Sequence, residues 1–421
     1  MNSKPEAVGT QSPKVSADRL WARHMHLAEY GRLESGGVNR PAFSPEDAQA
    51  RCQLIRWATA IGLEPSLDAI GNLFLRKKGS RAGLAPVYTG SHLDTQPTGG
   101  KFDGIYGVLA GLEVLQSLHE SGLRTARDIV LVVWSNEEGS RFAPTTMGSS
   151  VYVKKLALSE ATQSCDADGH RLAQVLPAFL AAHGDVPVAD ITDIPYAYLE
   201  AHIEQGPVLE KAGLPLGVVT GIQGLRWFEV VVTGQEAHAG TTPLDARADA
   251  LQVAVGLAKT LMDDFKAAGP EVRFTIGRWQ AWPGSPNTVA GRVVFSIDLR
   301  HPDSAALEVF ASAIEAHCAA ANGVCTVALS ALSASPSVAF SAPLQTLVES
   351  AAARWGAPCM KLISGATHDA KWLNGITQTA MLFAPCERGI SHNPRESAKA
   401  EDLALVAQVL AETLVCLAQR P

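Results

Sequence analysis

Two apolar runs that each end in a polar loop, with a helical segment between them, constrain the fold of this chain more than any other feature. The runs "APVYTGSHLDT" (85–95) and "DIVLVVW" (128–134) have the composition of buried strands, and "GVLAGLEVLQSLHESG" (107–122) has helical spacing and ends at Gly122. Strand, helix and strand in this order predict a wound α/β sheet. Ligands of such sheets bind beyond the carboxyl ends of the strands, where "GSHLDT" and "SNEEGSRF" lie.

The middle of the chain has a different pattern, which predicts an inserted domain. Four alternating segments indicate antiparallel strands: "GVVTGI", "RWFEVVVTG", "VRFTIGRW" and "RVVFSIDLRHP". Two helical segments lie among them, "DALQVAVGLAKTLMDDFKAAG" and "AALEVFASAIEAHCAAANG". We therefore expect an α+β unit at 215–333 that interrupts a discontinuous catalytic domain formed by 18–214 and 334–421. Residues 1–17 are polar and predict a disordered tail.

Composition excludes several classes of protein. A chain of 421 residues exceeds one comfortable core, and its hydrophobic share of 47% is that of an ordinary folded protein. The net charge of -7 and the absence of a basic stripe argue against nucleic acid as a partner. No apolar stretch approaches the length of a membrane span. The seven cysteines are scattered without a CxxC pair, which favours reduced thiols, so we expect a cytoplasmic protein.

Histidines and carboxylates follow the predicted strands and suggest a metal site. His92, Asp94 and Asp103 lie in "TGSHLDTQPTGGKFDG", and Glu138 follows the next strand along the chain. Two further imidazoles lie at strand ends, those of His202 in "EAHIEQG" and His392 in "GISHNPRE". Imidazole with carboxylate, and no cysteine, suits Zn, Mn, Co or Ni, and two ions fit if one carboxylate bridges them. The alternatives are that Asp103 caps a helix and that the Glu137–Glu138 pair is a solvated turn.

Seven motifs, taken together and in order, carry a family resemblance. They are "GSHLDTQPTGGKFDG", "NEEGSRF", "HIEQGPVLE", "EAHAGTTP", "PNTVAGRVVFSIDLRHP", "SGATHDA" and "SHNPRE". The chain resembles the metal-dependent hydantoinase/carbamoylase-type amidohydrolases, which include N-carbamoyl-L-amino-acid hydrolase, β-ureidopropionase and allantoate amidohydrolase. These are relatives of the dinuclear zinc aminoacylases and aminopeptidases. The resemblance implies a mixed-sheet dinuclear-metal hydrolase domain with helices on both faces, interrupted by an inserted dimerisation domain.

The resemblance also implies roles for the strand-end residues. One divalent ion is held by His92, Asp103 and His202, and a second by Asp103 as the bridge with Glu138 and His392. Zn is the first expectation for both ions. Glu137 is implied as the general base, because adjacent residues that leave a strand point in different directions. Asp94 is implied as the carboxylate that orients His92.

The inserted domain is implied to complete the site in a homodimer. His238 is expected at the oxyanion, and Asn287 and Arg300 at the substrate carboxylate, from where they reach the active site of the partner. Gln205 is expected to hold the ureido group. From the residues alone, His238 could be a structural histidine, Arg300 a surface ion pair and Gln205 a loop cap. Thr367 stands in "SGATHDA" where the family more often has glycine, and we do not assign His368 as a ligand.

The resulting hypothesis is hydrolysis of the ureido C–N bond of an N-carbamoyl amino acid to the amino acid, ammonia and carbon dioxide. Allantoate or another ureido acid is the first alternative substrate. An aminoacylase or dipeptidase on the same scaffold, and a non-catalytic metal-binding relative, rank behind these. A nucleotide-binding protein is disfavoured because no GxGxxG or GxxxxGK[ST] sequence follows a strand.

Overall fold

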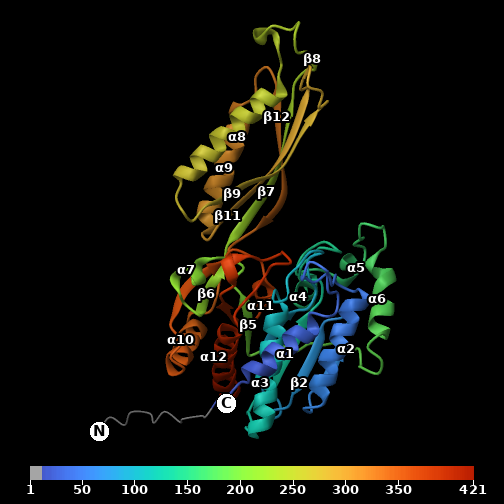
Figure 1. Cartoon of the computed structure of the whole chain (residues 1–421), viewed down its shortest axis with the longest axis vertical. Helices are drawn as coiled ribbons and strands as arrows, with labels where there is room; N and C mark the ends of the chain where they lie inside the picture. The colour runs from blue at the N-terminus through green and yellow to red at the C-terminus, as the bar shows by residue number, and fades with distance from the viewer. Residues whose placement is uncertain (1–11) are drawn as a thin grey trace, which may run out of the picture. The chain divides into compact units, whose positions relative to one another are not determined.

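The computed structural model describes residues 12–421, which form two compact units (Figure 1). Of the described residues, the first unit contains 12–220 and 340–421, and the second contains Gly221–Ala339. Residues 1–11 of the predicted tail lie outside the described residues. For the rest of that tail the prediction of disorder is wrong. The backbone from Pro13 to Ser16 is hydrogen-bonded to the side chains of Gln408 and Glu113, and the first helix begins at Ala17.

A mixed sheet is the centre of the first unit. Its described strands pair in the order β1 (Glu64–Leu67), β2 (Leu73–Lys77), β4 (Ile129–Trp134), β3 (Val87–His92), β5 (Ala197–Ile203), β15 (Gln378–Ala384) and β6 (Leu216–Ile222). Two more strands, β13 (Val338–Ala339) and β14 (Cys359–Ser364), pair with β6. The four neighbours β4, β3, β5 and β15 run parallel, whereas β2 and β6 are antiparallel to their neighbours. The predicted mixed α/β fold is confirmed.

Helices cover both faces of this sheet because its strands are apolar on both sides. One face packs against α3 (Ile105–Ser121), α10 (Ala342–Arg354) and α12 (Ala400–Ala418), and α1 (Ala17–Leu27) packs on α3 and α12. Strand side chains on the opposite face of the sheet, such as Trp134, face α4 (Met147–Tyr152) and α11 (Ala370–Leu373). The remaining helices of the unit are α2 (Pro45–Thr59), α5 (Leu158–Ala161), α6 (Leu172–Ala181) and α7 (Val208–Ala212). Apolar strands buried on both faces are the pattern expected of a parallel sheet.

Local signals in the sequence explain where two of these helices begin and end. The Ser44 hydroxyl accepts the backbone N–H of Asp47 and Pro45 is the first residue of α2, both of which favour a helix start. Helix α3 ends at Gly122, whose φ of 68° is in the left-handed region that glycine adopts without strain.

The second unit is an antiparallel sheet with two helices on one side. The strand order is β12 (Thr326–Ser335), β7 (Gly224–Thr233), β11 (Arg292–His301) and β9 (Arg273–Trp282). Helices α8 (Ala250–Ala267) and α9 (Ser304–Ala320) close its core, and a short ribbon pairs β8 (Ala237–His238) with β10 (Thr288–Val289). Two short 3-10 turns complete the described elements, Leu244–Ala246 here and Glu387–Gly389 in the first unit.

One strand of the predicted insert is wrong. The segment "GVVTGI" forms β6, which pairs with β15 in the sheet of the first unit, and the fourth strand of the second unit is β12. β12 has the sequence "TVALSALSAS", whose small and largely exposed residues give little apolar alternation. The compact second unit therefore covers 221–339, where the prediction was 215–333. Among the described residues, no helix is both long and apolar enough to cross a membrane.

Candidate metal centre

Parallel strands bring the predicted ligands to one edge of the sheet. His92 is the last residue of β3, and His202 lies one residue before the end of β5. Glu137 and Glu138 follow β4, and His392 is in the segment after β15. Because β3, β4, β5 and β15 are parallel, their carboxyl ends meet at the same edge.

The carboxylate of Asp103 lies at the centre of this cluster. Its Oδ1 is 3.8 Å from Nε2 of His92 and 3.3 Å from Nε2 of His202. Its Oδ2 is 3.2 Å from Nε2 of His392, which in turn is 3.5 Å from Oε2 of Glu138. The two oxygens of one aspartate thus face two separate groups of potential ligands, His92 with His202 and Glu138 with His392. Asp103 does not cap α3 with its side chain, since the N-cap residue is Gly104.

Backbone carbonyls orient two of the imidazoles. Nδ1 of His92 lies 2.9 Å from the carbonyl oxygen of Asp94, and Nδ1 of His202 lies 2.9 Å from that of Ile203. For His92, a proton on Nδ1 that is donated to the Asp94 carbonyl leaves the Nε2 lone pair directed at Asp103, which is the arrangement a metal ion needs. Gly104 gives the His92 ring its space, because a Cβ at that position would lie 2.3 Å from Nε2.

The predicted role of Asp94 differs from its geometry. Its carboxylate is 3.8 Å from Nδ1 of His92, and the shorter contact to that ring is made by its backbone carbonyl. The carboxylate instead accepts the backbone N–H groups of Glu137 and Glu138, at 3.3 and 3.1 Å. Asp94 therefore holds the turn that carries the two glutamates.

The adjacent glutamates diverge toward different histidines. Oε2 of Glu137 is 3.5 Å from Nε2 of His92, while Oε2 of Glu138 is 3.5 Å from Nε2 of His392. The amide of Gln96 donates to Oε2 of Glu138 at 2.8 Å. Both glutamates are more than nine-tenths buried, so the alternative of a solvated turn is excluded.

Burial and mutual repulsion disturb the pKa values of these groups. Burial lowers the pKa of His92 to about 4, which keeps the ring neutral. Burial, and then the charge of Asp103, raises the pKa of Glu138 to about 8. For Glu137, burial and the neighbouring charges of Asp369 and Glu138 raise the pKa well above its usual range. Burial opposes ionisation of Asp103 too, but hydrogen bonds from His202 and His392 outweigh it and lower that pKa well below its usual value.

The donor set fits divalent cations. Four carboxylates, those of Asp94, Asp103, Glu137 and Glu138, are buried within one cluster, and such a concentration of negative charge calls for compensating cations. Neutral imidazoles and carboxylates with no cysteine are ligands that Zn and similar metals accept. His92, Asp103, Glu138, His202 and His392 are the residues that would hold such ions.

Gln205 and His368 border the cluster. The Gln205 amide donates to Oδ2 of Asp103 at 2.8 Å, and its own Oε1 is buried without a hydrogen-bond partner among the described residues. The His368 ring packs edge-on against His202 with 4.5 Å between ring centroids, and its Nε2 is 2.9 Å from the hydroxyl of Ser364. His368 also lies with Glu200 and His202 in a buried group that could hold a metal ion, although its Nε2 already contacts Ser364.

The predicted substrate residues of the second unit divide into two places. His238 and Asn287 are neighbours on the β8–β10 ribbon, where His238 pairs with Thr288 and the carbonyl of Asn287 accepts the N–H of Ala239. Arg300 lies near the end of β11 and forms an ion pair with Asp298 at 2.8 Å. The β8–β10 ribbon adjoins the end of the sheet where β11 begins, at Arg292. Arg300 lies eight residues further along β11, so about 26 Å of strand separates it from that end.

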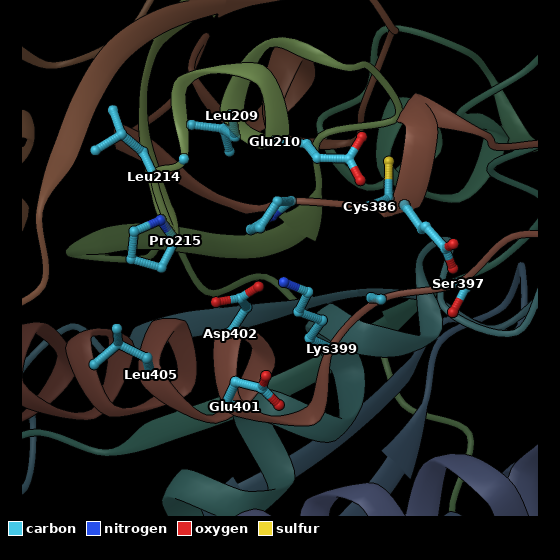
Figure 2. Close-up of a pocket in the computed structure, with 14 residues that line it drawn as sticks. Leu209, Glu210, Leu214, Pro215, Cys386, Ser397, Lys399, Glu401, Asp402 and Leu405 are labelled. Carbon is cyan, nitrogen blue, oxygen red and sulfur yellow. The ribbon is translucent and has the colours of Figure 1, made fainter.

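A separate cavity of about 430 Å³ lies in the first unit (Figure 2). Its walls come from α7, the end of β15 and the start of α12, and include the carboxylates of Glu210, Glu401 and Asp402. None of the five predicted metal ligands lines this cavity. Cys386 and Ser397, which do line it, flank the loop that carries His392, so the cavity lies behind that loop and apart from the cluster.

Sequence reasoning assigned no role to several residues that hold the cluster together. Gln96, Ser391 and Glu396 all hydrogen-bond predicted ligands or their backbone. Each lies inside a motif that already contained a predicted ligand, and this proximity in sequence was the available signal.

A mixed α/β sheet with imidazoles and carboxylates gathered around one aspartate at its strand ends defines a divalent-metal-dependent hydrolase. The chain belongs to the Peptidase family M20/M25/M40, whose sequence pattern it matches over residues 88–415.

Amidohydrolases are among its relatives. It is 37% identical over 404 residues to an N-carbamoyl-L-amino-acid amidohydrolase of Rhizobium meliloti, covering 95% of this chain and 96% of that protein. An allantoate amidohydrolase of Bacillus subtilis is 34% identical, with 93% and 95% covered. The crystal structure of a hydantoinase/carbamoylase-family amidase from Burkholderia multivorans superposes with a TM-score of 0.90 at 41% identity, covering 97% of this chain and 99% of that one.

Proposed function

We propose that this protein hydrolyses the terminal ureido C–N bond of an N-carbamoyl-L-amino acid. Water adds to the ureido carbon, ammonia leaves, and the remaining carbamate loses carbon dioxide to give the free amino acid. The observation that carries the proposal is the division of the two Asp103 oxygens between two ligand groups, with Glu137 beside one of them. The names and extensive coverage of the relatives support this substrate class.

The ligand geometry supports two divalent ions per subunit, with Zn the first expectation and Mn, Co or Ni as alternatives. When bound, such ions lower the pKa of water and polarise a carbonyl group. Glu137 accepts the proton of the attacking water and passes it to the leaving nitrogen, a task suited to a carboxylate whose pKa is raised. The buried, unpartnered Oε1 of Gln205 accepts an N–H of the ureido group.

The substrate carboxylate is bound by Asn287 and Arg300, and His238 stabilises the oxyanion. An N-carbamoyl amino acid is about two residues long, roughly 7 Å. Within a single subunit, about 26 Å of sheet separates the His238–Asn287 pair from Arg300, so both cannot contact the same substrate molecule. We therefore propose a homodimer in which one of these two places serves the catalytic unit of the partner. All seven cysteines lie in the described part of the chain and are free, in keeping with the cytoplasm.

Ammonia release by metal-stripped protein refilled with Zn, Mn, Co or Ni tests the proposal. The substrates are several N-carbamoyl-L-amino acids, N-carbamoyl-β-alanine, allantoate, an N-acetyl amino acid and a dipeptide, with free amine measured for the last two. We expect metal-dependent turnover of an N-carbamoyl-L-amino acid that Glu137→Gln abolishes. Glu160→Gln, at an exposed residue of α5, is the matched control and should leave turnover unchanged.

The panel also separates the alternatives. Turnover of allantoate alone would move the protein to the second candidate, which the Bacillus relative favours. Cleavage of only the acetyl or dipeptide substrates would replace the proposal by an aminoacylase or peptidase. A protein that binds metal but turns over nothing would contradict a catalytic function on these substrates.

A further inference from the structure

We propose that Glu396 is a positioning residue that joins the two loops which carry the bridging aspartate and His392, and that it thereby sets the affinity for divalent metal. The inference rests on the proposed metal function of Asp103 and His392. Glu396 touches no predicted substrate atom and is itself no metal ligand in the clusters described above.

Each oxygen of the Glu396 carboxylate is committed to a different loop. Oε1 accepts the backbone N–H of Phe102 at 2.8 Å and that of Asp103 at 3.1 Å. Oε2 accepts the hydroxyl of Ser391, next to His392, at 2.8 Å. Residues 293 positions apart in the chain are therefore held by one side chain.

The same network reaches the carboxylate of the bridging residue. The Ser391 hydroxyl is also 3.3 Å from Oδ2 of Asp103, and the Gln205 amide is 2.8 Å from the same oxygen. The Glu396 side chain thus binds the backbone N–H of Asp103 directly, and it is connected to the Asp103 carboxylate through the Ser391 hydroxyl. Metal sites lose affinity when the groups that orient their ligands are removed.

The site is built for this side chain. Glu396 is only 4% exposed, and the N–H of Glu387 donates to the carbonyl of Ser397 at 2.7 Å, which closes the loop carrying Ser391 and His392 at its base. A Cβ at Gly100 would lie 2.0 Å from Oε1 of Glu396. The absence of a side chain at Gly100 therefore leaves room for the carboxylate beside the backbone of Phe102 and Asp103.

Three substitutions divide the network. Glu396→Ala removes all three hydrogen bonds. Glu396→Gln keeps an oxygen for the two backbone N–H groups but replaces the acceptor of the Ser391 hydroxyl by an amide donor and removes one negative charge. Ser391→Ala removes the hydrogen bond to Oε2 of Glu396 together with the 3.3 Å contact to Oδ2 of Asp103. A fourth variant, Gly100→Ala, displaces the carboxylate without changing its chemistry.

The measurement is the dissociation constant for Zn and Co in the full-length protein by competition with a chromophoric chelator. Visible absorption of the bound Co reports its ligand geometry. We expect Glu396→Ala and Gly100→Ala to weaken binding about 10- to 100-fold and to change the Co spectrum. Ser391→Ala should weaken it less, and the double variant should lose less affinity than the sum of the two single losses, because the two side chains share one hydrogen bond.

Glu113→Gln is the matched control for loss of a buried carboxylate. Glu113 is fully buried and accepts a backbone N–H, from Ser16 at 2.8 Å, and a serine hydroxyl, from Ser117 at 3.1 Å. It lies at α3 and the N-terminal segment and takes no part in the metal cluster. We expect this variant to lose thermal stability while its metal affinity and Co spectrum stay those of the wild type.

The outcome separates this inference from the proposed function. If the wild type binds metal tightly and Glu396→Ala binds it within twofold of the wild type, the positioning role is wrong while the function stands. If the wild type itself holds no divalent ion, the proposed function fails first. An equal loss of affinity in Glu113→Gln would also overturn the inference, since the effect would then be general destabilisation.

Discussion

Gly104→Ala should weaken metal binding at least tenfold, although it adds only a single carbon. Gly104 follows Asp103 and has a φ of 69°. The new Cβ would lie 2.3 Å from both Cε1 and Nε2 of His92, distances that real Cβ contacts do not show. The ring has little freedom to retreat, because its Nδ1 is bonded to the Asp94 carbonyl and the side chain is buried.

Two costs add at this position. The left-handed region costs an L-residue roughly 1–2 kcal/mol, and Gly104, with a ψ of -50°, lies outside even that region, so its cost is at least as large. Forcing an extra carbon into a packed site costs about 1–3 kcal/mol more. The second cost is paid by displacing Nε2 of His92, the atom directed at Asp103, so we expect loss of stability together with loss of metal affinity.

Gly122→Ala at the other end of α3 is the matched control. Its φ is 68°, but a Cβ there would meet nothing within 4 Å. We expect thermal unfolding to show about 1–2 kcal/mol of destabilisation for Gly122→Ala with unchanged metal affinity and turnover. Gly104→Ala should be less stable than Gly122→Ala and at least tenfold weaker in metal binding. Wild-type metal affinity in Gly104→Ala, or an equal loss in Gly122→Ala, would refute the steric reasoning.

Three further outcomes are expected. Trp372→Phe removes the hydrogen bond from Nε1 to the Thr146 hydroxyl at 2.8 Å, and the N–H of Thr146 donates to the carbonyl of Glu137. We therefore expect kcat to fall about fivefold with little change in KM. Trp355→Phe, at an exposed site, is the control and should change neither constant. Burial lowers the pKa of His24 from 6.5 to about 4. Because the unfolded chain binds this proton at a higher pH than the folded chain, the free energy of unfolding should be full above pH 6.5 and fall by roughly 3 kcal/mol by pH 4. In unfolding titrations, His24→Phe should lose less of this free energy as the pH falls. Removing metal with a chelator should lower the midpoint of thermal unfolding. Metal added back at 1,000 times its dissociation constant should raise the free energy of unfolding by about 4 kcal/mol. A midpoint that does not change with metal would contradict a metal site in the folded state.

The order of elements in the first unit could be predicted because its strands are long apolar runs that end sharply in polar loops. "DIVLVVW" and "APVYTGSH" became β4 and β3, and Gly122 ended α3 as its position suggested. The exchange of β6 for β12 has the opposite cause. β6 contains two glycines and directly precedes β7 in the chain, so its pattern does not tell which sheet it joins, and the alanine and serine residues of β12 carry almost no hydrophobic signal.

The candidate site shows a similar limit. Residue type, position in the loops that follow strands and the family resemblance together selected five candidate ligands that the structure brings together. The partners of those ligands could not be selected in this way. Glu396 meets the N–H of Asp103 only because two loops far apart in the chain are adjacent in space, and Asp94 contacts His92 through its carbonyl, an atom that every residue has.

The arrangement of the cluster explains why the glutamate pair follows β4 and no other strand. β4 pairs in parallel with β3, so its end lies beside His92, and Asp94 accepts the N–H groups of both glutamates across this pair of strands. That turn directs Glu137 to His92 and Glu138 to His392, one to each side of Asp103. A single glutamate at this place could reach only one side. Two adjacent carboxylates on a turn fixed by Asp94 place one carboxylate on each side of Asp103 without a further loop.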